Sequence, residues 1–190
     1  MGNKIIAVGA SLGGMHALAR LLSALPRDLG GTVVSVLHRG EGSSEDLIRF
    51  LQSASVLPVR EAEDKDELER GTVYVAPAGY HLLVEKGGLA LSTDDPVSWA
   101  KPSIDVLFES AADAWAEHVI GVVLTGANSD GALGLAQIKE CGGLTVVQAP
   151  SEAECPIMPA AAIAASPIDH VLTLAEIPPL LVRLCPGLTK

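Results

Sequence analysis

The 190-residue chain has few basic residues, few aromatic residues and no long apolar run. Lys and Arg together number 13 against 23 Asp and Glu, which gives a formal net charge of −10. Nucleic-acid binding depends on basic patches that neutralise phosphates, so this composition argues against nucleic acid as a partner. With only two Trp, two Tyr and two Phe, the core has to be built from Val, Leu, Ile and Ala, as suits helices packed on a buried parallel sheet.

Targeting signals and a membrane span are also missing from the sequence. No apolar stretch reaches the roughly 20 residues that a spanning helix needs. The N-terminal MGNKIIAVGA passes from a short apolar run into a glycine-rich turn, unlike a signal peptide, and Ile6 stands where a myristoylation signal has Ser or Thr. We therefore expect a cytoplasmic protein without an inserted segment.

The cysteines and histidines do not form a metal-binding pattern. The three cysteines are odd in number and include no C-x-x-C pair, which favours reduced, structural thiols. They are Cys141, Cys155 and Cys185. His16, His81 and His118 belong to no H-x-x-x-H pair, so the sequence predicts neither a metal nor a cofactor.

Apolar strand patterns alternate with helical patterns, and 48% of the residues are apolar, so one domain spanning residues 1–190 is expected. Predicted strands lie at 4–10, 32–38, 72–77, 80–86, 89–93, 119–126 and 144–150. Gly87 and Gly88 predict a hairpin turn between two of the middle strands. This order predicts a doubly wound α/β fold, with a mostly parallel sheet, helices on both faces and one antiparallel hairpin excursion.

The helical segments carry the apolar faces and capping residues that such a fold needs. The first should end at Pro26, and its buried face is formed by Met15, Leu18, Leu21, Leu22 and Leu25. The second has acidic residues in its first turn and Ser44 as its expected N-cap. Pro102 and Ser103 should open the third.

Polar residues follow three of the predicted strands where those strands end. Ser11 follows the first strand, His38 ends the second, and Asp130 lies just past VVLTG. Ligands of open parallel sheets bind outside the carboxyl ends of the strands. If these strands are parallel, the three side chains lie at one edge of the sheet.

Ser11 has two interpretations. It fits the pattern G-x-S-x-G, in which a sharp strand-to-helix turn exposes a nucleophilic hydroxyl, and the helix beginning near Leu12 would direct free N–H groups at a developing oxyanion. GASLGG also resembles a phosphate loop of a dinucleotide site, but a G-x-G-x-x-G pattern is missing and the second strand ends in His38 and Arg39 instead of an acid.

His38 and Asp130 also have structural alternatives. His38 could be the base for Ser11 or a structural strand-end histidine. Asp130 could orient the imidazole or cap the helix that follows it. A rival triad of Ser11, Asp130 and His170 would match the chain order of α/β-hydrolases, but the HGGG-type oxyanion segment is missing.

Seven segments resemble, in order, the catalytic domain of the CheB-type chemoreceptor glutamate methylesterases, over roughly residues 3–184. They are IAVGASLGG, VLH, VYVAPAGYHLLV, KPSIDVLFESAA, GVVLTGANSDGALGL, GGLTVVQAP and MPAAAIA. The resemblance implies a Ser–His–Asp triad, here Ser11, His38 and Asp130, and a backbone oxyanion donor near Ala127. It also implies hydrolysis of glutamate γ-methyl esters on the cytoplasmic helices of methylated chemoreceptors, with release of methanol.

The sequence departs from the better-known members at several positions. Leu12 stands where they often have Thr, Ala127-Asn128 replaces a usual Met-Gly, and Arg39-Gly40 replaces a common Met-Pro. Those members carry an N-terminal receiver domain, whereas this chain opens on the catalytic strand, so we expect an enzyme without its own phosphorylation switch. Two alternatives stay open: a non-catalytic binding module of a chemosensory complex, and an esterase or amidase, such as a glutamine deamidase, with another protein substrate.

Overall fold

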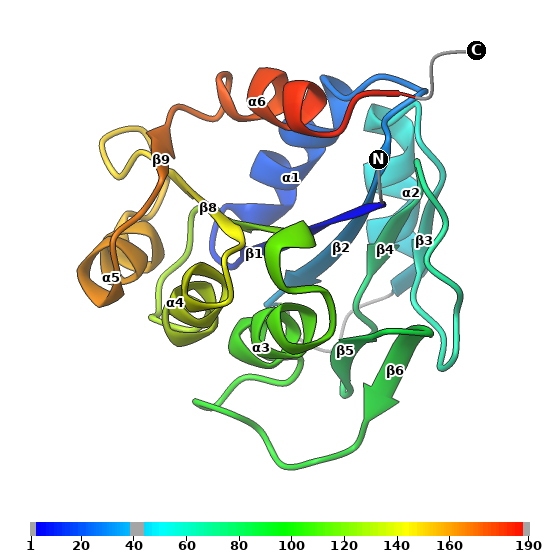
Figure 1. The fold of residues 1–190 in the computed structure, drawn as a ribbon, viewed down its shortest axis with the longest axis horizontal. Coiled ribbons are helices and arrows are strands. Elements are labelled where there is room, and N and C mark those ends of the chain that lie inside the picture. The colour runs from blue at the N-terminus through cyan, green and yellow to red at the C-terminus, as the bar shows by residue number, and fades with distance from the viewer. Residues whose placement is uncertain (1–2, 39–43, 188–190) are drawn as a thin grey trace.

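A seven-stranded sheet, in which every pair of neighbouring strands is parallel, forms the centre of the molecule (Figure 1). A computed structural model describes residues 3–38 and 44–187. The strand order is β3-β4-β2-β1-β7-β8-β9. The strands are β1 (Lys4–Ala10), β2 (Gly31–Leu37), β3 (Val59–Glu61), β4 (Val73–Val75), β7 (Val119–Val123), β8 (Leu144–Gln148) and β9 (His170–Leu172).

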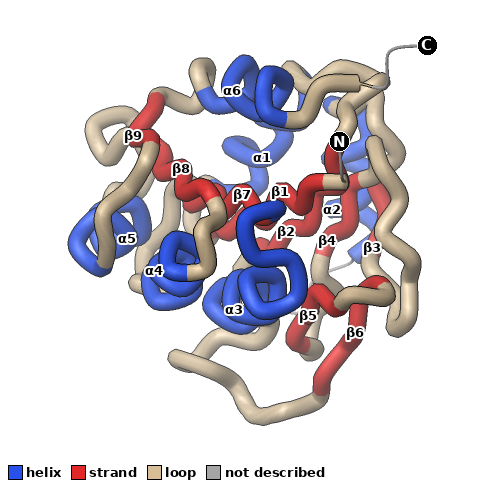
Figure 2. Tube along the Cα trace, viewed as in Figure 1, coloured by secondary structure: helices blue, strands red, loops and turns tan. Residues whose placement is uncertain are grey.

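Helices cover both faces of this sheet, which confirms the predicted doubly wound fold (Figure 2). One face carries α1 (Gly14–Ser23), α2 (Ser44–Ala54) and α6 (Ile177–Leu184), and the other carries α3 (Ile104–Trp115), α4 (Ala132–Glu140) and α5 (Ile157–Ala165). A short 3₁₀ turn, η1 (Ala116–His118), follows α3. Successive residues of a strand point to opposite faces, so Ile6 of β1 packs in the first core and Ile5 in the second.

The antiparallel excursion is a separate hairpin of β5 (His81–Glu85) and β6 (Gly88–Ser92). It packs on the α3 side of the sheet, where Leu82 and Leu89 are buried. Gly88, in the predicted turn, has a φ of +151°, which side chains rarely adopt, and a Cβ there would lie 2.3 Å from the Asp66 carbonyl oxygen. The turn therefore needs glycine at this position.

The order of the strands creates a crevice beside β1. From β1 the chain builds the β2 side of the sheet and then returns to build the β7 side. Such a reversal leaves a crevice at the carboxyl ends of the two strands that flank it. Ser11 and Asp130 follow these two strands, and His38 follows β2.

Some sequence-based expectations need correction. The helical spacing predicts Met15 on the buried face of α1, but Met15 is 40% exposed and lines a cavity together with Ser11. The short strands β3 and β9 were not predicted. Ser44 is the first residue of α2, and the residue before it lies outside the described part of the chain. Among the described helices, none is long and apolar enough to span a bilayer.

Candidate active site

Backbone hydrogen bonds hold the turns that carry Ser11 and His38 against their neighbours. The N–H of Ser11 donates to the Thr125 carbonyl at 2.9 Å, and the N–H of His38 donates to the Ala10 carbonyl at 3.0 Å. Both bonds continue the hydrogen bonding of the sheet past the ends of the strands. As a result, Ser11 and His38 line a common cavity of about 400 Å³, together with Asn128 and Trp99.

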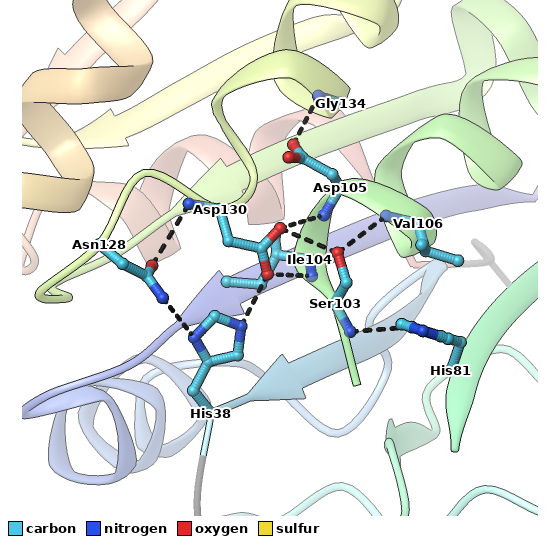
Figure 3. A network of polar contacts seen from close by, with 9 residues as sticks. All are labelled: His38, His81, Ser103, Ile104, Asp105, Val106, Asn128, Asp130 and Gly134. Carbon is cyan, nitrogen blue, oxygen red and sulfur yellow. Dashed lines mark hydrogen bonds and ion pairs between the residues drawn. The ribbon is translucent and has the colours of Figure 1, made fainter. Parts of the chain in front are cut away.

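His38 and Asp130 are in direct contact (Figure 3). The imidazole Nε2 and the carboxylate Oδ2 are 2.7 Å apart. An ionised carboxylate only accepts hydrogen bonds, so Nε2 carries the proton of the neutral ring. The arrangement leaves Nδ1 as the nitrogen with a lone pair.

Asp130 lies at the N-terminus of α3, where it accepts hydrogen bonds from four donors. Besides His38, these are the Ser103 hydroxyl at 2.9 Å and the N–H groups of Ile104 at 2.7 Å and Asp105 at 3.0 Å. Burial opposes the charge, but the hydrogen bonds from these donors outweigh it and lower the pKa of the Asp130 carboxyl below its ordinary value. The carboxylate is thus ionised and fixed in position.

This placement contradicts the alternative that Asp130 only caps the helix that follows it. The sequence allows Asp130 to cap the helix that follows it, but the N-cap of α4 is Gly131, which makes no side-chain capping bond. Asp130 instead satisfies the free N–H groups of α3, a helix that precedes it in the chain. Such a contact across the fold leaves no local signal in the sequence.

A buried polar layer behind Asp130 was missed in the sequence analysis. Ser103 is fully buried, and its N–H donates to His81 Nδ1 at 3.2 Å. His81 itself is 1% exposed. Its other ring nitrogen, Nε2, donates to the Asp95 carbonyl oxygen at 3.0 Å. His81 therefore positions Ser103, and Ser103 positions Asp130. The one sign of this layer in the sequence is a histidine within the apolar pattern of a predicted strand.

Thr125 joins the turns after β1 and β7. Its hydroxyl donates to the Leu12 carbonyl at 2.9 Å and accepts from the Cys155 N–H at 2.8 Å, while its own N–H donates to Gln148 Oε1 at 2.9 Å. Thr125 is buried. It therefore fixes the backbone around Ser11, a role that the sequence did not predict.

The surroundings of Ser11 suit a reacting group. In the described part of the chain, the Ser11 hydroxyl makes no hydrogen bond, and the N–H groups of Leu12 and Ala127 donate to no protein acceptor. Gly13 precedes α1 in the left-handed conformation, with φ of 77°. A free hydroxyl that shares a cavity with an oriented imidazole can perform nucleophilic acyl transfer.

Asn128 contacts the other ring nitrogen of His38. Its Nδ2 lies 3.2 Å from His38 Nδ1, and its Oδ1 accepts from the Asp130 N–H at 3.3 Å. The sequence marked this residue only as a departure from the family pattern. The other departure from the family pattern that follows the histidine, Arg39-Gly40, lies outside the described residues.

The rival triad with His170 is wrong. His170 begins β9, the edge strand, which runs parallel to β8. It pairs with Val146 in the middle of β8, and β7 and β8 separate its strand from β1 and Ser11. The imidazole that contacts Asp130 is that of His38.

Among the residues that the structure describes, no thiol takes part in the hydrogen-bond network of this site. Cys141, Cys155 and Cys185 are free, and burial raises the pKa of the Cys185 thiol to about 11. Within residues 3–38 and 44–187, the structure contains no cluster of three or more His, Cys, Asp or Glu that could hold a metal ion.

Comparisons with known proteins point to one family. Residues 6–181 match the CheB methylesterase family. The chain is 46% identical over 185 residues to a protein of Leptospira interrogans whose name contains "protein-glutamate methylesterase/protein-glutamine glutaminase", covering 97% of this chain and 96% of that protein. It is 39% identical to a Cupriavidus metallidurans protein-glutamate methylesterase/protein-glutamine glutaminase 2, of which it spans 55%. The crystal structure of the Thermotoga maritima CheB methylesterase catalytic domain matches with a TM-score of 0.92 and 31% identity, covering 97% of this chain and 100% of that one.

Proposed function

Because the chain belongs to the CheB methylesterase family, we propose that it hydrolyses γ-methyl esters of glutamate on chemoreceptors, with Ser11, His38 and Asp130 as a catalytic triad. One observation carries the proposal. His38 is held by Asp130 at 2.7 Å and lines the same cavity as the Ser11 hydroxyl. A non-catalytic binding module would not need these three groups at one edge of the sheet.

The proposed reaction proceeds in two acyl-transfer steps. Ser11 Oγ attacks the ester carbonyl and His38 Nδ1 takes its proton, while Asp130 stabilises the imidazolium. The N–H groups of Leu12 and Ala127 bind the oxyanion. His38 then protonates the leaving oxygen to give methanol, and finally activates a water that releases the glutamate. A primary amide in place of the ester would release ammonia, and the names of both relatives include a glutaminase activity.

Exposed apolar side chains around the cavities support a protein as the substrate. Trp99 is fully exposed, Leu12 is 56% exposed and Met15 is 40% exposed. Each lines a cavity that also contains Ser11. The proposed partner is therefore a cytoplasmic helix of a methylated receptor, which would place the enzyme in the cytoplasm.

The test is methanol release from a methylated receptor fragment by the native protein, Ser11→Ala and Ser129→Ala. We expect Ser11→Ala to lose at least about a thousandfold in rate, because it removes the nucleophile. Ser129 lies exposed in the Asp130 loop, and its substitution should leave the rate unchanged. Equal release by the native protein and Ser11→Ala would overturn the triad. Receptor binding without release by the native protein would favour the binding module.

A further inference from the structure

The hydrogen bonds of Asn128 fix the orientation of its amide. The N–H of Asp130 is a donor only, so the Asn128 atom that faces it, at 3.3 Å, is the carbonyl oxygen Oδ1. The amide nitrogen Nδ2 then necessarily faces His38 Nδ1, at 3.2 Å. Figure 3 shows the amide between the imidazole and the backbone of Asp130.

This orientation agrees with the tautomer of His38. Because Nδ2 is a donor only, it has to meet the unprotonated ring nitrogen, which leaves the proton on Nε2 for Asp130. The three residues close a ring of hydrogen bonds, from the Asp130 N–H to Asn128, from Asn128 to His38 and from His38 to the Asp130 carboxylate.

The ring occupies the nitrogen that Ser11 needs. A neutral imidazole nitrogen has one lone pair in the plane of the ring and accepts one good hydrogen bond. Asn128 holds that lone pair, and in the described part of the chain the Ser11 hydroxyl makes no hydrogen bond. Ser11, His38 and Asn128 nevertheless line one cavity.

We propose that Asn128 is a positioning residue that holds His38 in a resting arrangement, with its amide in the place of the Ser11 hydroxyl on Nδ1. The amide has to withdraw before Ser11 can transfer its proton. This inference rests on the proposed role of Ser11 as the nucleophile. Asn128 thus orients the base in the resting protein and slows the first step of the reaction.

A fluorophosphonate probe tests this step without a receptor. Its reaction forms a bond between Ser11 Oγ and phosphorus, expels fluoride and transfers the serine proton to His38. Asn128→Ala should be labelled roughly two- to tenfold faster than the native protein, since a competing hydrogen bond of ordinary strength is removed. Ser129→Ala, on the same loop, should be labelled at the native rate, and thermal melting checks that each variant is folded.

The outcomes separate the two proposals. Equal labelling of Ser11→Ala and the native protein would contradict Ser11 as the nucleophile, whatever Asn128 does. Labelling that depends on Ser11 but is unchanged or slower in Asn128→Ala would overturn the inference about Asn128 alone. A loss of about a hundredfold or more would instead identify Asn128 as an oxyanion donor.

The ¹⁵N NMR signals of the His38 ring give a second readout that a merely structural residue would not move. In the native protein, Ser11→Ala should leave the Nδ1 signal unchanged, because Asn128 occupies that nitrogen. In Asn128→Ala, the Ser11 hydroxyl is free to bind Nδ1. Adding Ser11→Ala to that variant removes this hydrogen bond and should therefore shift the Nδ1 signal. A shift caused by Ser11→Ala in the native background would overturn the proposal.

Discussion

At the residue scale, the Ser103 hydroxyl has two partners that matter for different reasons. It donates to Asp130 at 2.9 Å, and it accepts from the Val106 N–H at 3.4 Å as the N-cap of α3. We expect Ser103→Ala to lower the free energy of unfolding by about 1–2 kcal/mol, because a buried carboxylate and a helix end each lose a partner. Methanol release should also fall, because Asp130 is less firmly held.

Urea unfolding and the methanol assay measure the two effects of Ser103→Ala. Ser53→Ala is the matched control, since the Ser53 hydroxyl only bonds the Phe50 carbonyl on the exposed surface of α2. If both variants have the same midpoint of urea unfolding as the native protein, the buried Ser103 hydroxyl does not contribute to stability and the account of Asp130 is wrong.

The sequence could place Ser11, His38 and Asp130 near one another because one rule of topology, the common edge of parallel strands, was enough. It could not predict their supports. The hydroxyl of Ser103 reaches Asp130 across 27 positions, and that of Thr125 reaches Leu12 across 113. Such contacts depend on how the loops pack, and a single sequence carries no periodic signal for them.

At the element scale, the close packing of α3 on α4 depends on Gly134. A Cβ at this position would lie 2.6 Å from Phe108 Cβ and 2.8 Å from the Asp105 carbonyl oxygen. We expect Gly134→Ala to lower the free energy of unfolding by about 1–3 kcal/mol, although alanine normally stabilises a helix interior, because the two backbones have to separate. Activity should fall as well, since α3 carries the donors for Asp130.

Denaturant unfolding of Gly134→Ala and Gly87→Ala checks this expectation. At Gly87 a Cβ would meet nothing within 4 Å, so that variant should stay within about 0.5 kcal/mol of the native protein. A Gly134→Ala protein that is as stable as the native one would show that the helices adjust without cost.

The length and apolar content of an element decide whether the sequence reveals it. The seven-residue β1 and β2 are nearly continuous buried runs, as is typical of central parallel strands, and the ten-residue α1 is long enough to show a helical period. The strands β3 and β9 have three residues each and include charged or polar residues, as VRE and HVL, whereas the equally short β4, which was predicted, is the wholly apolar-facing VYV. Helix periodicity identifies the face on which Met15 lies, but it does not tell whether that part of the face meets the core or a cavity, as Met15 does.

At the scale of the whole molecule, two apolar cores share one sheet. Ile6 and Val8 of β1 belong to one core, and Ile5 and Ala7 belong to the other. Neither core can lose its packing without exposing the strands that support the other. This arrangement supports the single domain over residues 1–190, which stays a prediction.

The dependence of the molecule's stability on pH should be governed in part by two buried carboxyls that respond in opposite directions. Burial, reinforced by the nearby charge of Asp130, raises the pKa of Asp105 from 3.8 to about 6, whereas hydrogen bonds lower that of Asp130. Between about pH 4 and pH 6 the folded protein keeps the Asp105 proton that the unfolded chain has lost. The contribution of Asp105 to stability therefore falls as the pH rises through this window.

Asp105→Asn removes this effect while keeping an oxygen to accept from the Gly134 N–H, a bond of 2.8 Å in the native protein. The free energy of unfolding of Asp105→Asn minus that of the native protein should increase by up to about 3 kcal/mol between pH 4 and pH 7. Both proteins should still lose stability below about pH 4, where Asp130 becomes protonated in the unfolded chain.

Urea unfolding between pH 3 and pH 8 measures the difference between the two curves. Glu45→Gln, which affects an exposed carboxylate in the first turn of α2 and its surface ion pair with Arg49, should stay within about 0.5 kcal/mol of the native curve. A constant difference between Asp105→Asn and the native protein would mean that Asp105 ionises alike in the folded and unfolded states. In that case the N-terminus of α3 stabilises both carboxylates, and the burial of Asp105 does not make its charge costly.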